Sequence, residues 1–547
     1  MNTIKEKTLL SEPKTLFTYK GKRFQLQSVL LVALMVFTFF LYSGALKNEV
    51  LIGWDDGEYL TNPEITSPAP GSGSAIFSEF HLGMYQPLVI LSFIFNYKLA
   101  GDAAFGYILV NILLHLINIW LVYKLVLRLL GSFEVAWIVA LLFAIHPAHV
   151  EAVVWISTRS SLLYSFFFLA GLLQYDKYLA TRLRKHYVLA LVLATASLFS
   201  KSMAATFPLM LFLIDYLRVR RFTWKSTLEK IPFLTLSVIF GVIAIKASAA
   251  SGHITVLETQ YSIFERLVLI LYGISFYMVK MVLPVNLSAI YAFPGNADGS
   301  LPGWVYTPMI AVFVYAIIIL RSRTNRRLYI FGGLFFLAGI SMVLPLFWSR
   351  IFITADRYTY IPYIGLLIIL ASGLKKLWDQ RHGMQKSTRN MLYIAAAMIL
   401  LLIIDIVFER IKVWHDVPAL MTDVLEKQRS DTDMSHAYFY LGNYYDVRGE
   451  DEEALKHYDL SISRNKNYLL AYNNRAILLG KHGNFNAAIS DLTTAITLKP
   501  TYAEAWYNRG VAHYQMGKKD KAHKDWLKAS RLGFGQADEV LTRYCNP

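Results

Sequence analysis

Two adjacent carboxylates, Asp55 and Asp56, are the first residues of this sequence whose types and spacing could do chemistry. They lie in the stretch 54–59, WDDGEY, a few residues after an apolar run. A carboxylate pair can act as a general base and can bind a substrate or a metal ion. The alternative is a solvated acidic loop that happens to hold two Asp residues.

A second polar cluster holds His146, His149, Glu151 and Arg159 within the stretch 146–159, HPAHVEAVVWISTR. Imidazole and carboxylate groups near a membrane surface could bind a metal or hydrogen-bond a sugar. The spacing does not match the His-Glu-x-x-His pattern of zinc proteases. The alternative is a set of polar residues that anchors the end of a helix.

Two basic residues stand at the edges of other apolar runs. Lys201 lies in Ser-Lys-Ser, and Arg357 lies in the stretch 355–362, ADRYTYIP. A guanidinium can form a bidentate pair of hydrogen bonds with a phosphate, and an ammonium can bind a phosphate as a point charge. Asp356 could orient Arg357. The alternative for both basic side chains is that they extend to the membrane interface.

The composition indicates which elements must position these residues. The chain has 547 residues, of which 55% are hydrophobic and only 17% charged, whereas soluble proteins are about 25% charged. Residues 409–547 hold 19 Lys and Arg and 18 Asp and Glu, so nearly all of the net charge of +16 falls before them. Cytoplasmic loops of membrane proteins collect Lys and Arg. We therefore expect a membrane protein with no nucleic-acid partner.

Eleven apolar runs predict membrane spans, because each approaches the roughly 20 residues that cross a bilayer. They lie at 26–46 and near 105–127, 134–155, 160–179, 187–200, 203–217, 230–248, 304–320, 328–347, 358–374 and 391–408. Two further stretches, 86–99 and 263–283, are interpreted as interfacial or re-entrant. If only one of these two crosses fully, the C-terminal part changes sides.

Lys and Arg clusters predict the orientation of the spans. Residues 1–24 form a basic, cytoplasmic N-terminus, and 25–408 form the membrane domain with an external loop at 47–85. An odd number of crossings places the C-terminal part outside the cytoplasm. All four polar motifs then fall on the external side, which favours one active site at the membrane surface.

The C-terminal part repeats with a period of 34 residues. Glycines recur in one phase and alanines in another: Gly449, Gly483, Gly517, Ala437, Ala471 and Ala505. This is the tetratricopeptide pattern of two helices per repeat. We predict a linker helix at 409–434 and three repeats at 435–547, which present a concave surface to peptides or proteins. The alternative is a bare spacer or an oligomerisation module.

In these motifs the chain resembles the TMTC-type O-mannosyltransferases, membrane proteins with tetratricopeptide repeats. Five segments carry the resemblance in order: the Asp55-Asp56 loop, residues 146–155, the segment around Lys201, residues 284–291 and residues 357–362. The resemblance implies a GT-C glycosyltransferase fold and a polyprenyl-phosphate-linked sugar as donor. Ser202 departs from the family pattern, which is often acidic there, and the repeat array is short.

The resemblance also implies roles for the residues. Asp55 or Asp56 would deprotonate the acceptor hydroxyl, and Arg357 and Lys201 would stabilise the departing lipid phosphate. The substrate pocket would be lined by His146, His149, Glu151, Arg159, Asp356 and Tyr360. The repeats would hold a protein or peptide acceptor. Metal dependence is left open.

The sequence therefore predicts an all-α, GT-C-like polytopic membrane domain followed by a tetratricopeptide α-solenoid. The expected activity is inverting transfer of mannose or a similar hexose from the lipid carrier to a hydroxyl, with protein Ser/Thr as the expected acceptor. The main alternative is a non-catalytic scaffold; a transporter ranks third, because the ionisable residues collect at the span edges rather than deep within them. The expected location is a bacterial inner membrane, with the endoplasmic reticulum as the alternative.

Overall fold

The computed structural model describes residues 15–19, 22–68, 76–218, 223–250, 255–256, 261–294, 300–345, 348–349, 352–427 and 434–544. Most of the expected cytoplasmic segment 1–24, and part of the expected loop 47–85, lie outside these residues. The chain forms two compact units, which we describe separately. The membrane unit comprises residues 1–50 and 58–415, and the repeat unit comprises residues 51–57 and 416–547.

The membrane unit is helical, as the composition predicts. Its main helices are α1 (Leu26–Tyr42), α5 (Pro87–Ala100), α6 (Ala104–Leu130), α7 (Phe133–Ile145), α8 (Val150–Val154), α9 (Arg159–Thr181), α10 (Arg184–Leu198), α11 (Phe207–Leu217), α12 (Trp224–Leu228), α13 (Ile231–Ala250), α14 (Ile263–Val282), α15 (Ile310–Arg321), α16 (Arg326–Ile340), α17 (Tyr363–Gln380) and α18 (Lys386–Val413). Helix α3 (Pro63–Thr66) is a single turn. Strands β1 (Thr15–Tyr19) and β2 (Lys22–Gln25), and β3 (Thr255–Val256) and β4 (Trp348–Ser349), form two small antiparallel pairs.

Seven helical segments among the described residues are long and apolar enough to cross a membrane, and a bent pair raises the number to eight. The chain is a multi-pass membrane protein, but the predicted count of eleven spans is not confirmed. The bent pair joins α7 to residues 147–154 with an angle of 56°. Because a bend of this size interrupts the helix, it places residues 146–151 at a break rather than on a continuous span.

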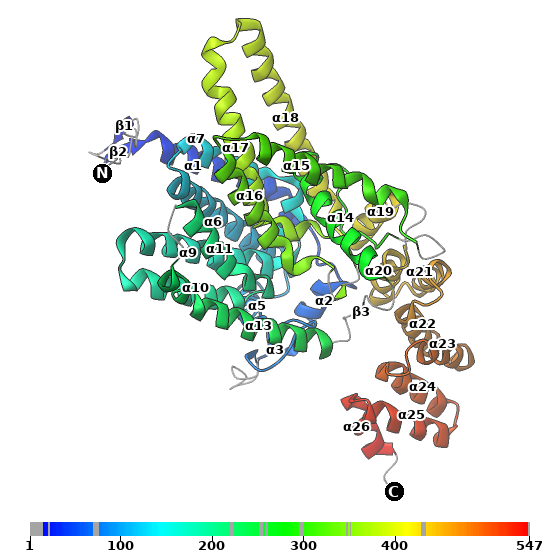
Figure 1. The fold of residues 1–547 in the computed structure, drawn as a ribbon. Helices are drawn as coiled ribbons and strands as arrows, with labels where there is room; N and C mark the ends of the chain where they lie inside the picture. The colour runs from blue at the N-terminus through cyan, green and yellow to red at the C-terminus, as the bar shows by residue number, and fades with distance from the viewer. Residues whose placement is uncertain are drawn as a thin grey trace. The chain divides into compact units, whose positions relative to one another are not determined.

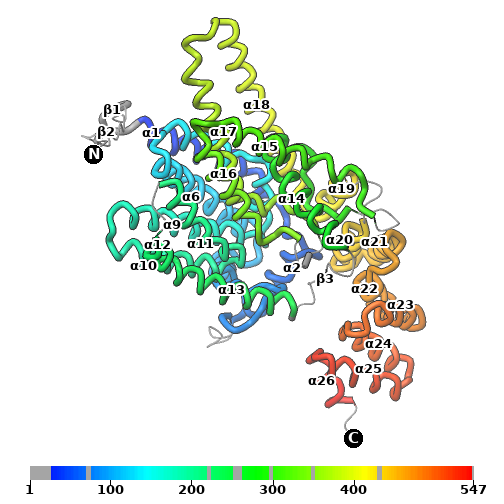
Figure 2. The backbone as a smooth tube through the Cα atoms, viewed as in Figure 1, coloured from blue at the N-terminus to red at the C-terminus, as the bar shows by residue number. Residues whose placement is uncertain are grey.

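Close helix crossings hold the elements that carry the polar motifs. Helices α16 and α17 cross at Gly332 and Gly365, where an added Cβ on Gly365 would lie 2.3 Å from the Gly332 carbonyl oxygen. Only glycine permits this approach, and it fixes the start of α17 just after the Arg357 motif. Figure 1 shows α6, α9, α10 and α11 side by side in this unit, while α17 and α18 continue as a hairpin beyond the other helices (Figure 2).

The repeat unit contains the predicted tetratricopeptide solenoid. After α19 (Val417–Lys427) come the helix pairs α20 (Ser435–Val447) with α21 (Asp451–Arg464), α22 (Leu469–Lys481) with α23 (Phe485–Leu498), and α24 (Ala503–Gln515) with α25 (Lys519–Arg531), followed by α26 (Gly535–Tyr544). The orange-to-red end of the chain shows these pairs in succession (Figure 2).

The 34-residue period reappears in the contacts of the repeats. Arg475 donates to both Asp491 oxygens at 2.8 and 2.7 Å, and Arg509 does the same to Asp525 at 2.8 and 2.9 Å. Each pair joins the two helices of its repeat. The turns between the helices contain Gly449, Gly483 and Gly517, which adopt φ of +75°, +77° and +76°. Glycine is favoured where the backbone is left-handed, which explains why glycine recurs at this position of each repeat.

Candidate active site

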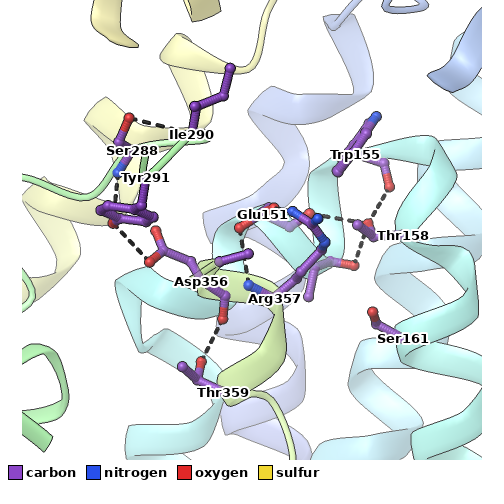
Figure 3. Close-up of polar contacts among 12 residues, drawn as sticks. Glu151, Trp155, Thr158, Ser161, Ser288, Ile290, Tyr291, Asp356, Arg357 and Thr359 are labelled. Atoms are coloured by element: carbon purple, nitrogen blue, oxygen red, sulfur yellow. Dashed lines mark hydrogen bonds and ion pairs between the residues drawn. The ribbon is translucent and has the colours of Figure 1, made fainter. Parts of the chain in front are cut away.

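The Arg357 motif is held in place by backbone contacts from two other segments. The Ala355 amide donates to the Tyr277 hydroxyl at 3.0 Å, and this hydroxyl donates to the Ala355 carbonyl at 3.3 Å. The Ile353 amide donates to the Tyr291 carbonyl at 3.0 Å. The chain then turns into the 3-10 helix η8 (Asp356–Thr359). This anchoring sends the side chains of residues 356 and 357 in different directions (Figure 3).

Arg357 forms an ion pair with the buried Glu151, as the close-up shows (Figure 3). One Glu151 oxygen accepts from the Arg357 backbone amide at 3.0 Å, and the other accepts from its guanidinium. The guanidinium also lies over the rings of Trp155 and Tyr358, at 5.3 and 5.0 Å. Two motifs that are 206 residues apart thus meet at one ion pair. The Arg357 side chain keeps 14% of its surface exposed, so the cation remains partly accessible.

Asp356 lies beside this ion pair and points to Tyr291 (Figure 3). The Tyr291 hydroxyl donates to Asp356 Oδ1 at 2.9 Å and accepts from the Ser288 amide at 2.8 Å. Burial, and to a smaller extent the Glu151 carboxylate, raise the pKa of the Asp356 carboxyl to about 7, against the lowering effect of Arg410. Asp356 can therefore gain and lose a proton near neutral pH.

Lys201 also lies close to Tyr358. Its Nζ donates to the Ser161 hydroxyl at 2.7 Å and lies 5.8 Å from the centre of the Tyr358 ring. The residue is 7% exposed and lines a small cavity. Residues 83–86, Ser202, Ala244 and Ser248 complete the lining. Arg357 and Lys201 thus lie 5.0 and 5.8 Å from the centre of the same Tyr358 ring, so both predicted phosphate-binding residues belong to one region.

The predicted histidines are buried and bonded to backbone groups. His149 Nδ1 lies 2.8 Å from the Phe143 carbonyl, and His146 Nε2 lies 3.2 Å from the Met281 carbonyl. Tyr360 is fully buried, and its hydroxyl lies 2.6 Å from Nδ1 of His115. These contacts are those expected of anchored helix ends, which was the alternative interpretation. A place for His146, His149 and Tyr360 in a substrate pocket stays a prediction.

Arg159 is fully buried at the start of α9. Its guanidinium donates to the side-chain oxygens of Asn111 and Asn96 and to the Tyr107 carbonyl. Asn111 in turn donates to the Trp155 carbonyl at 3.0 Å. The network therefore supports the segment that carries Trp155, and a direct contact of Arg159 with substrate stays a prediction.

Asp55 and Asp56 belong to the repeat unit. Asp55 opens α2 (Asp55–Leu60) and is half-buried, whereas Asp56 is buried and accepts from the Leu51 amide at 3.2 Å. The Gly53 carbonyl accepts from the Asn443 side chain at 3.3 Å, and Trp54 packs against Tyr440 with ring centres 5.3 Å apart. The structure thus places the Asp pair on a segment held by the first repeat, which sequence analysis did not anticipate.

Sequence reasoning missed Arg410, a buried residue near the end of α18 that acts electrostatically on both Asp356 and Tyr291. A signal was present, because an ionisable residue within an apolar span is a functional hypothesis by default. Ser161 carried no comparable signal. Within the described part of the chain, no group of three or more His, Cys, Asp and Glu side chains is arranged to hold a metal ion.

Comparisons with known proteins agree with the motif resemblance. The family model described as dolichyl-phosphate-mannose-protein mannosyltransferase matches residues 86–247, and tetratricopeptide models match residues 481–517 and 503–533. The first match contains the His146 and Lys201 motifs but ends before Arg357. It covers the part of the chain that contributes Glu151 to the ion pair.

Curated relatives are named protein O-mannosyl-transferases. One from Caenorhabditis elegans is 28% identical over 56% of this chain and 44% of its own length. One from Mus musculus is 22% identical over 85% of this chain and 59% of its own length. The resemblance to TMTC-type proteins is thereby confirmed, and the chain spans about half the length of these relatives. The solved structure of ArnT from Cupriavidus metallidurans is 14% identical and covers 91% of this chain and 79% of its own, with a TM-score of 0.37; a likeness at this level carries no functional argument.

Proposed function

We propose that this chain is an inverting membrane glycosyltransferase that moves mannose or a similar hexose from a polyprenyl-phosphate carrier to a Ser or Thr hydroxyl of a protein. One observation carries the proposal: Arg357 and Lys201 both lie close to the Tyr358 ring, and the buried carboxylates Glu151 and Asp356 lie in the same region. The names of the relatives support the same reaction class.

The proposed reaction is a single displacement at the anomeric carbon. The acceptor oxygen forms a bond to this carbon as the bond from the carbon to the phosphate oxygen breaks. The hydroxyl proton goes to the carboxylate of Asp55 or Asp56, which acts as general base. The bonding electrons leave with the polyprenyl phosphate, whose negative charge grows in the transition state. Groups aimed at developing charge lower the barrier.

Arg357 and Lys201 are the groups we assign to that phosphate. Arg357 is suited to it because its guanidinium is fixed by Glu151 and by two ring faces, so little ordering is needed when the phosphate binds. Lys201 supplies a second cation and lines the cavity described above. Glu151 acts through Arg357 as a positioning residue, whereas Asp356, which accepts from Tyr291, is assigned to the substrate pocket. We place the reaction on the external face, with the N-terminus cytoplasmic, as the Lys and Arg distribution predicts.

The test uses the full chain purified in detergent, together with its Asp55→Asn and Asp56→Asn variants. A panel of polyprenyl-phosphate sugars is offered with a Ser/Thr-rich peptide, and released lipid phosphate and glycosylated peptide are both measured. We expect turnover by the wild type, and its loss in one Asp variant that folds as the wild type does. A chain that binds none of these donors would overturn the proposal and favour a scaffold that works through its repeats.

A further inference from the structure

The charge of the repeat unit changes from its first repeat to its last. Residues 435–468 hold 4 Lys and Arg against 6 Asp and Glu, residues 469–502 hold 3 against 1, and residues 503–536 hold 7 against 3. The net charges of the three successive repeats are therefore −2, +2 and +4. Because all three repeats have the same length and the same two helices, the repeat fold itself does not require this gradient.

Much of the positive charge of the last repeat lies on one face of α25. Four exposed basic residues fall within about 80° of one another around the axis of this helix, at 3.6 residues per turn. We call them the basic stripe: Lys521, Lys524, Lys528 and Arg531. Among the residues that the structure describes, no carboxylate forms an ion pair with any of the four, whereas Arg509 of the same repeat is paired with Asp525.

Another face of α25 fixes the orientation of the basic stripe. Trp526 is buried in the repeat, and its indole nitrogen donates to the Tyr507 carbonyl at 3.2 Å. The buried Asp525 accepts from Arg509 at 2.8 and 2.9 Å. These contacts hold α25 in one orientation, so the stripe can bind a flat anionic surface with little ordering of the backbone.

The equivalent positions of the earlier repeats carry no such stripe. The positions that correspond at the 34-residue period are Ala487, Ser490, Thr494 and Thr497 on α23, and Glu453, Lys456, Leu460 and Ser463 on α21. The single cation among them, Lys456, forms an ion pair with Glu453 at 2.9 Å. Packing within a repeat therefore does not explain the four cations. A surface that only confers solubility intersperses charges of both signs, and the basic stripe has one sign.

We infer that the basic stripe binds a membrane surface that contains anionic phospholipid. Each Lys or Arg close to an anionic bilayer strengthens binding about fivefold. Leu527 lies beside the stripe with 36% of its surface exposed, and an apolar side chain at this place can enter the interfacial region of the bilayer. Such binding is independent of the proposed transfer reaction and would hold the last repeat at the bilayer.

The connection between the two units favours a lipid partner over a separate acidic protein. The candidate span α18 ends at Val413 and α19 begins at Val417, so three residues join the repeat unit to a membrane-crossing helix. Packed helices are about 8–10 Å apart, so the helices from α19 to α25 keep the stripe within roughly 70 Å of the end of α18. A bilayer is therefore present at a high effective concentration, which a freely diffusing partner lacks.

The test measures how closely α25 approaches the bilayer in the full chain reconstituted into lipid nanodiscs. The probe is an environment-sensitive fluorophore attached at Leu527→Cys in a Cys545→Ser background, and the quencher is a phospholipid with a spin-labelled headgroup. The nanodiscs contain phosphatidylcholine alone or with about 30% phosphatidylglycerol as the anionic lipid. We expect quenching only with phosphatidylglycerol. It should be lost between about 0.1 and 1 M salt, where the screening length falls from about 10 to 3 Å.

Two charge variants with equal losses of charge make the test specific. The stripe variant combines Lys521→Gln, Lys524→Gln and Lys528→Gln. The matched control removes three exposed cations from the first repeat: Lys456→Gln, Arg464→Gln and Lys466→Gln. We expect the stripe variant to lower the ratio of bound to unbound repeat units on the order of 100-fold, which abolishes the quenching, and the control to keep it. Arg at the same three stripe positions should also keep it, because the charge is retained.

Each outcome decides between lipid and the other partners. Equal quenching in the two lipid compositions, or equal quenching in the wild type and the stripe variant, overturns the inference. Absence of quenching in every nanodisc also overturns it. If the chain binds poly-glutamate through the stripe lysines and shows no lipid-dependent quenching, the basic stripe belongs to an acidic protein partner and the assignment to the membrane is wrong.

Discussion

The two ends of α9 carry two unlike charge networks. In its last turns, one Asp176 oxygen accepts a hydrogen bond from Arg128 at 2.7 Å, and the other accepts one from Arg218 at 2.7 Å. At its start lies the Glu151 and Arg357 ion pair, with a second carboxylate, Asp356, beside it. The rise along α9 from Arg159 to Asp176 is roughly 25 Å at 1.5 Å per residue.

The difference separates a structural network from a candidate site. Near Asp176, Lys230 and Asp215 form a further ion pair at 2.6 Å that is fully buried, and Tyr175 donates to the other Asp215 oxygen at 3.0 Å. Each carboxylate there is matched by cations. At the start of α9, two carboxylates are close enough for one to raise the pKa of the other, and Lys201 lines a cavity. Groups whose pKa is strongly shifted by burial and by a neighbouring charge are typical of functional sites.

The largest effect should come from breaking the structural network. Lys230→Met leaves the buried Asp215 carboxylate without its cation, and we expect a loss of about 3–5 kcal/mol in the free energy of unfolding. Thermal unfolding in detergent measures it. Lys225→Met, at an exposed position one turn earlier, is the control. The double variant Asp215→Asn with Lys230→Met should recover much of the stability; if it does not, the network is not a simple ion pair.

Next in size is the loss of Glu151 from the candidate site. Glu151→Gln keeps an acceptor for the Arg357 amide but removes the charge that orients the guanidinium, and we expect transfer to fall about 100-fold. Steady-state turnover against donor concentration measures this. Glu134→Gln, at an exposed position on α7, should leave turnover unchanged. A variant as active as the wild type would place Arg357 outside the reaction.

A smaller effect concerns pH. The Asp356 carboxyl has a pKa of about 7 when folded, and an unfolded Asp has a pKa of about 3.9. Between these values the folded protein binds more protons, so stability falls as pH rises from about 4 to 7, by at most about 1.4 kcal/mol per pH unit. Melting temperatures across this range should show a shallower slope for Asp356→Asn. An unchanged slope would assign the proton to another group.

The smallest effect should come from Ser161. Ser161→Ala removes the hydroxyl that accepts from Lys201, and we expect the KM for the lipid-linked donor to rise two- to tenfold, for a hydrogen bond worth about 1 kcal/mol. The turnover number should stay unchanged. Ser165→Ala, one turn further along α9, removes a hydroxyl that bonds only within the helix and serves as the matched control. An equal rise in both variants would indicate a general effect on α9.

The sequence by itself determined the class of elements. Apolar runs and their Lys and Arg flanks predict a polytopic helical domain, because span length and burial are properties of local composition. The 34-residue period predicts the repeats, because Gly449, Gly483 and Gly517 each satisfy a local turn requirement. The charged residues could also be selected from sequence, since ionisable residues are expensive to bury in a membrane and are therefore rare in and beside apolar spans.

Only the tertiary structure decided how those residues combine. The pairing of Glu151 with Arg357, the contact of Lys201 with Ser161, and the effect of Arg410 on Asp356 depend on side chains from helices far apart in sequence. The attachment of residues 51–57 to the first repeat is also a long-range contact. Local composition does not predict such pairings, because the free energy of a contact depends on which surfaces the packed helices bring together.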